Sequence, residues 1–170
     1  MLGFLFRGLT AQPARGAALF GAITVRMRQP HWYVEGKVPD TIDGRFAVLA
    51  TLTALALVRI EQTGDEGNGA SVALTEQFIE VMETEHRELG LGDPKLGRTV
   101  RKLVGSLSRR IELWRGVVAG EHEWNEAAHE SLYGGGASPD AILHSARALE
   151  DYWARLARSD LPALVEGRLE

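Results

Sequence analysis

The sequence contains no cysteine, and this absence excludes three kinds of site. A disulfide framework, a metal centre held by thiolates and a cysteine nucleophile all require cysteine side chains. A chain without cysteine also fits a protein that works in a reducing compartment. Hydrophobic residues make up 45% of the chain and charged residues 25%, which is ordinary for a globular protein and does not favour disorder.

The sequence also lacks the motifs of the common catalytic sites. It has no glycine-rich phosphate loop, no nucleophile elbow and no dinucleotide-binding fingerprint. His129 follows His122 by seven residues, whereas a zinc-binding HExxH helix separates its histidines by four. His86 beside Glu85 is a second helical candidate for a metal, and it is equally incomplete. We therefore predict a protein that is not an enzyme and that uses no metal, cofactor or small-molecule substrate.

One stretch of the chain, residues 46–58, carries no charge at all. As a helix it rises about 20 Å, which is short of the roughly 30 Å needed to cross a membrane. A helix that is apolar on every side is buried in a soluble domain, so we predict a central helix at about 41–61. Asp40 is predicted to cap this helix, and Gly44 in its first turn predicts that another backbone passes close by.

The rest of the chain predicts a single all-α domain over residues 1–170, with six or seven helices around the central one and no strand. Pro30 ends the first helix, His31-Trp32-Tyr33 form a short connection that packs on the core, and residues 64–70 form an exposed loop. Leu89 is expected to point inward. The further helices are expected at 13–28, 71–89, 94–119, 121–133, 139–158 and 161–165. Residues 1–12 are expected to be flexible or to touch a membrane surface.

The helix predicted at 94–119 is strongly basic. Residues 95–115 contain seven bases and one acid, whereas residues 60–93 contain nine acids and one base. Three interpretations are open: the basic face is solvated or paired with the acidic helix, it binds a protein, or it binds RNA along the phosphate backbone. Trp114 is the only aromatic residue on this helix, and it belongs to the apolar stripe of the helix. This weakens the RNA interpretation, because proteins usually bind single-stranded RNA by stacking its bases on exposed aromatic side chains.

Two segments together resemble the ubiquinol–cytochrome c chaperone family. These are RQPHWYVEGKVPDTIDGRF (28–46) and HRELGLGDPKLGRTVRKL (86–103), and the resemblance runs from about Phe20 to Tyr133. It implies an all-α assembly factor for the cytochrome bc1 complex, with immature cytochrome b as its client. A small partner subunit, the ribosome and an anionic membrane surface are the further partners expected. The short N-terminus favours a bacterial member in the cytoplasm, peripheral to the inner membrane. The alternative function is an RNA- or ribosome-binding helical module that uses helix 94–119.

The candidate partner-binding residues come from the family motifs and from the basic helix. Arg45 and Arg87 have two interpretations: they pair with Asp43, Glu88 or Asp93 across helix ends, or they line a groove for an apolar segment of cytochrome b. The resemblance contributes Pro39, Asp40, Asp43, Arg45, Arg87, Glu88, Asp93 and Arg110, and the basic helix contributes Arg98, Arg101, Lys102 and Arg109.

Overall fold

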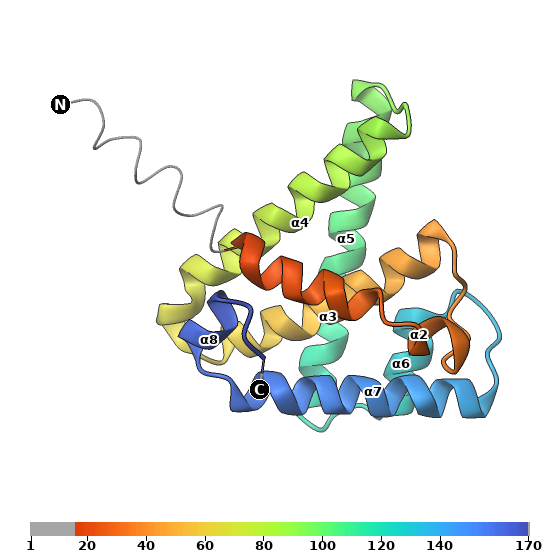
Figure 1. Ribbon diagram of the computed structural model, residues 1–170, viewed down its shortest axis with the longest axis vertical. Helices are drawn as coiled ribbons and strands as arrows, with labels where there is room; N and C mark the ends of the chain where they lie inside the picture. The colour runs from red at the N-terminus through yellow and green to blue at the C-terminus, as the bar shows by residue number, and fades with distance from the viewer. Residues whose placement is uncertain (1–15, 170) are drawn as a thin grey trace.

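The computed structural model describes residues 16–169, and these residues form an all-α fold with no strand, as the sequence predicts (Figure 1). A first helical segment spans residues 16–27. It is followed by α2 (His31–Val34), α3 (Ile42–Glu61), the 3₁₀ turn η1 (Gly64–Gly67), α4 (Asn68–Glu88), α5 (Asp93–Val118), α6 (Trp124–Leu132), α7 (Pro139–Arg158) and α8 (Leu161–Val165). The expectations for residues 1–12 lie outside the described residues.

Helix α3 is the predicted central helix, and the predicted bounds are confirmed to within one residue. All its side chains from Val48 to Val58 are buried, and α4, α5, α6 and α7 all pack against it. Figure 1 shows α3 crossing the middle of the molecule, with α7 along one edge. Burial on every side explains why the sequence of α3 shows no polar face. No helix in the described part of the chain is both long and apolar enough to span a membrane.

The two ends of α3 are held by different contacts. At the N-terminus, the side chain of Thr41 accepts a hydrogen bond of 3.2 Å from the backbone N–H of Gly44. Thr41 is therefore the N-cap, and the prediction of Asp40 in that role is wrong. Near the C-terminus, Arg59 donates hydrogen bonds of 3.0 Å to the carbonyl oxygens of Leu156 and Ser159. Since the last carbonyl groups of a helix lack partners within that helix, Arg59 closes the end of α7.

Helices α4 and α5 form a hairpin that extends beyond the rest of the molecule (Figure 1). Residues 64–70, predicted as an exposed loop, instead form η1 and the start of α4, and Gly67 there is buried. Gly90 has φ +87° at the C-terminus of α4, a left-handed conformation that glycine adopts without a steric penalty. The prediction that Leu89 points inward is wrong, because this side chain is 61% exposed at the hairpin tip, beyond the reach of the core.

The apolar stripe of α5 is confirmed. Leu96, Val100, Leu107 and Trp114 are buried, and Leu103, Ile111 and Val118 are partly buried against the core. The helix begins at Asp93, and Gly92 occupies its N-cap position. The opposite face of α5 is exposed to solvent and holds most of the cations of this helix.

The segment after the first helix is one turn of helix, α2, instead of a plain connection. Trp32 is 2% exposed, and its indole N–H donates to the carbonyl oxygen of Arg26 at 2.9 Å. The hydroxyl of Tyr33 donates to the carbonyl oxygen of Met27 at 2.8 Å. The predicted packing of this aromatic segment on the core is therefore confirmed for Trp32.

His31 joins α2 to α7 through His144, and this contact predicts a dependence of stability on pH. The two ring nitrogens lie 3.1 Å apart. Burial lowers the pKa of His31, the nearby His144 lowers it further, and Glu35 opposes the shift. An unfolded histidine titrates near its ordinary pKa of about 6.5. Below that pH the unfolded chain binds more protons than the folded protein, so stability is expected to fall as the pH drops from about 6.5 towards the lowered pKa.

The measurement is the urea-induced unfolding of the wild type and of His31→Gln at about pH 7.5 and pH 5.5. The variant is expected to lose less stability than the wild type between these two conditions. The matched control is His122→Gln, because His122 is exposed and lies outside the contact between α2 and α7. Equal losses in the wild type and in His31→Gln would contradict the prediction.

Candidate functional site

The family-like segment 39–46 makes a tight corner at the start of α3. A β-carbon added to Gly44 would lie 1.8 Å from the carbonyl oxygen of Pro39, so only glycine allows these two backbone segments to touch. The close approach predicted from Gly44 is therefore confirmed. This corner fixes where Asp43, Arg45 and Phe46 enter the first turn of α3.

Arg45 lies on the outer side of this corner and pairs with Asp40. Its Nε is 2.7 Å from the Asp40 carboxylate, and the guanidinium lies over the ring of Tyr33, 5.7 Å from the ring centre. The hydrogen bond to Asp40 raises the pKa of Arg45. The predicted pairing of Arg45 with Asp43, Glu88 or Asp93 is wrong, because the acid five residues earlier in the chain reaches it first. The pair is exposed and is therefore worth little to stability.

Arg110 is the most enclosed of the candidate residues. It donates to the carbonyl oxygen of Ser131 at 2.7 Å, and it also bonds the backbone and the hydroxyl of Ser106. Its guanidinium lies 5.9 Å from the ring centre of Phe46. Burial lowers the pKa of Arg110, the charge of Arg109 adds to this effect, and Glu130 opposes it. Arg110 thus fastens α5 to the end of α6 and to α3.

Two hollows flank Phe46. The first, of about 410 Å³, brings the motif residues Pro39 and Asp43 together with Arg110, and the segment from Glu130 to Gly134 closes it. The second, of about 190 Å³, lies between the first helical segment, α3, α4 and α5. Its apolar lining consists of Met27, Ile42, Phe46, Leu49, Met82 and Leu103, and its charged or titratable rim consists of Arg28, Asp43, Arg45, Glu85 and His86. We call this second hollow the apolar groove.

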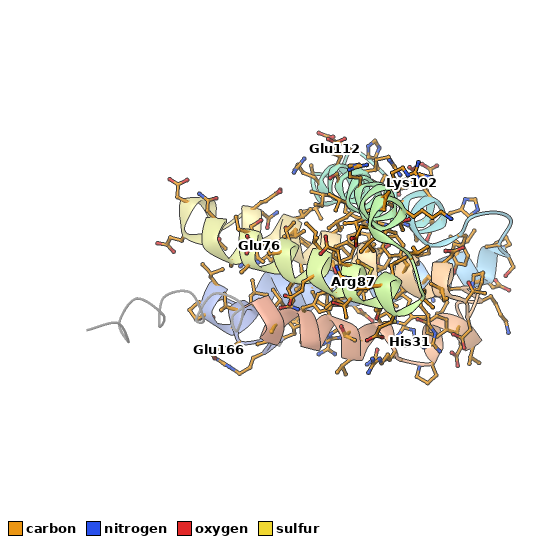
Figure 2. All side chains as sticks on the ribbon, turned by 90° about the horizontal axis from the view of Figure 1, so that it is seen from above. His31, Glu76, Arg87, Lys102, Glu112 and Glu166 are labelled. Carbon is orange, nitrogen blue, oxygen red and sulfur yellow. The ribbon has the colours of Figure 1, made fainter. Side chains whose placement is uncertain are left out.

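The remaining candidates lie away from the groove. Arg87, Glu88 and Asp93 are exposed near the hairpin tip and form no ion pair with any described residue. Arg98, Arg101, Lys102 and Arg109 are exposed on the outer face of α5. Seen down the hairpin, Lys102 lies at the α5 edge of the molecule and His31 at the opposite edge (Figure 2). The structure therefore separates the candidates into a group around the groove and a group on the hairpin.

A buried polar cluster beside Arg110 was not identified from the sequence. The hydroxyl groups of Thr51 and Ser131 lie 2.6 Å apart, and the indole N–H of Trp114 donates to Ser131 at 3.2 Å. These contacts hold α3, α5 and α6 together. A serine within a short helix is an ordinary solvent-facing residue in sequence, and only the fold shows that Ser131 is 3% exposed. No signal in the sequence marks it.

A helical protein with an open apolar groove offers a surface for a polypeptide segment. Residues 16–169 contain no group of three or more side chains placed to hold a metal ion.

This chain belongs to the ubiquinol-cytochrome C chaperone family, whose model matches residues 34–169. The fold is similar to the crystal structure of the Cbp3 homolog from Brucella abortus, with a TM-score of 0.77. The match has 23% sequence identity and covers 98% of this chain and 94% of that one. No curated protein matches the sequence. The resemblance found in the two sequence motifs is thereby confirmed.

Proposed function

We propose that this protein is a non-catalytic assembly chaperone that binds immature cytochrome b during biogenesis of the cytochrome bc1 complex. Membership of a chaperone family supports the general role. The observation that carries the proposal for a client is the apolar groove, which lies beside the family-like corner at residues 39–46. A partly assembled membrane protein exposes apolar segments to water, and a groove with an apolar floor can shield part of one of them.

Ile42 is the contact that we expect to matter most for capture. Its side chain is 63% exposed and yet lines the apolar groove, so it is available to a partner without supporting the core. Burying such a side chain against an apolar segment stabilises a complex, whereas a carboxylate at the same place must lose its water when the partner binds. Arg45 and Asp43 on the rim are placed to bond polar backbone groups of the same segment.

The test is the capture of cytochrome b by Ile42→Asp in a bacterium that makes the cytochrome bc1 complex. Recovery of cytochrome b with the tagged variant is expected to fall about tenfold or more relative to the wild type. A strain without the cytochrome b gene sets the background. The control variant is Val72→Asp, because Val72 is also β-branched and is 57% exposed on α4, outside the groove. Equal recovery with Ile42→Asp and the wild type would refute the groove as the client site.

RNA binding by α5 remains the second candidate function, and one observation favours it: the outer cations of α5 have no ion-pair partner among the described residues. The structure adds no stacking platform on this helix, because Trp114 is 0% exposed. We place the protein at the cytoplasmic face of the inner membrane as part of the same proposal, since its client is a membrane protein.

A further inference from the structure

The tip of the α4–α5 hairpin is uncharged and partly apolar. Residues 89–92 read LGLG, and Leu89 is 61% exposed while Leu91 is half-buried. The tip projects away from the rest of the protein (Figure 1). An apolar side chain at the end of a projection has no core within reach. Leu89 is therefore available to a surface outside this chain.

Five exposed cations follow the outer face of α5, and we call them the basic stripe: Lys95, Arg98, Arg101, Lys102 and Arg109. Successive residues of an α-helix are about 100° apart, which places the five within an arc of about 120°, opposite the apolar stripe. The basic stripe extends about 21 Å along the helix from near the tip. Figure 2 shows Lys102 on the α5 side of the molecule, the same side as Glu112.

The side chains of the acidic helix α4 are not paired with the basic stripe. No ion pair joins α4 to α5 in the described part of the chain. Arg115 is the cation of α5 that does pair, at 3.0 Å, and its partner Glu61 belongs to α3. The interpretation of an internally paired basic face therefore fails for the stripe, which keeps its charge available for an anionic partner.

We propose that the α4–α5 hairpin docks on an anionic lipid bilayer. The basic stripe lies against the lipid phosphate groups, and Leu89 enters the boundary between headgroups and acyl chains. Cations close to an anionic leaflet are attracted to it, and an apolar side chain adds burial at the interface. Glu88 and Asp93 flank the tip, and Glu112 is exposed on the same face of α5 as the stripe. These three acids oppose the attraction, but the five cations of the stripe outnumber them. This docking is separate from the apolar groove and does not require the proposed client.

A lipid bilayer accounts for both the basic stripe and the exposed Leu89, whereas RNA accounts only for the basic stripe. A phosphate backbone would use the cations, but it offers no apolar medium for Leu89. Single-stranded RNA would also need aromatic side chains for stacking, and the one aromatic of α5, Trp114, is buried and hydrogen-bonded to Ser131. The observations therefore favour the bilayer over RNA.

The test is sedimentation of the full-length protein with two kinds of vesicle, one of phosphatidylcholine alone and one of equal parts phosphatidylcholine and phosphatidylglycerol. The wild type is expected to bind only the anionic vesicles, and to be released when salt rises from about 0.1 M to about 1 M. Arg98→Glu with Lys102→Glu is expected to lower the partition coefficient by about 30-fold or more. Leu89→Ser is expected to lower it about tenfold.

The matched control is Arg147→Glu with Arg155→Glu, which makes the same change in net charge on exposed positions of α7. This control is expected to bind anionic vesicles as the wild type does. Equal binding to both kinds of vesicle, an equal loss in the α7 control, or binding to RNA without binding to vesicles would overturn the proposal. If the hairpin does not bind the bilayer, the proposal that the apolar groove binds cytochrome b is unaffected, because the Ile42→Asp test contains no bilayer-binding step.

Discussion

Replacing Trp114 by alanine is expected to lower the free energy of unfolding by about 3–5 kcal/mol, because the substitution removes a large side chain from a closed site. Trp114 is 0% exposed, and its ring lies 5.5 Å from that of Trp124. Its indole N–H also donates to Ser131, so the variant removes a link between α5 and α6. For a domain of this size the loss corresponds to a fall in melting temperature on the order of 10 °C.

The measurement for Trp114 is urea unfolding followed by far-ultraviolet circular dichroism. The control is Trp114→Phe, which keeps most of the volume and loses the donated hydrogen bond. Ser131 retains its contact with Thr51 in that variant, so we expect a loss of only about 1 kcal/mol. If Trp114→Ala were as stable as Trp114→Phe, neighbouring side chains would have filled the cavity left by the indole, and the prediction would be wrong.

Replacing Gly44 by alanine is expected to destabilise the fold by about 1–3 kcal/mol or more. The new β-carbon would overlap the carbonyl oxygen of Pro39, which is backbone and cannot rotate away. The corner at residues 39–44 must therefore open, and the first turn of α3 must shift with it. Because Phe46 and Ile42 line the apolar groove, the same shift is expected to weaken client capture.

Gly69→Ala is the control for Gly44→Ala because it makes the same substitution in the first turn of a helix. A β-carbon at Gly69 meets nothing within 4 Å. Alanine is a better helix former than glycine, so this variant is expected to gain up to about 1 kcal/mol. The melting temperatures of the two variants should move in opposite directions from the wild type. A rise in both would refute the close contact between Gly44 and Pro39.

The sequence predicted well where one physical signal dominates a long segment. The uncharged run 46–58 located α3 because a helix buried on all sides cannot tolerate charge. The regular spacing of apolar residues located α5 and the side of it that is buried. In both cases the signal comes from many residues, so no single local preference decides the outcome.

The predictions failed where a contact between distant or competing residues decided the structure. Gly64 to Ala70 read as a loop because glycine disfavours helices, yet the backbone of Ile60 lies so close to Gly67 that only glycine fits there. Leu89 fits the helical period of α4, but the hairpin extends past the core that would have covered it. Asp40 and Thr41 are both good caps, and the corner at Gly44 selects Thr41.

The candidate site was predicted only in part for the same reason. Gly44 in the motif 39–46 correctly predicted the close approach of another backbone segment. The partner of Arg45 was not predicted, because it depends on which acid the side chain reaches across the corner. The link between Thr51 and Ser131 spans 80 residues of sequence. Such a pairing follows from how whole helices pack, and local patterns contain no information about it.

The hydrogen bonds from Arg59 to the end of α7 can form only after α7 has been synthesised. The carbonyl groups that Arg59 binds lie about a hundred residues downstream of it, and α7 also covers part of α3. A ribosome that adds roughly 5–20 residues per second needs about 4–16 s to proceed from the end of α3 to the start of α7. During that interval α3, the most apolar of the described helices, is incompletely covered. This chaperone is thus itself exposed to aggregation while it is being made.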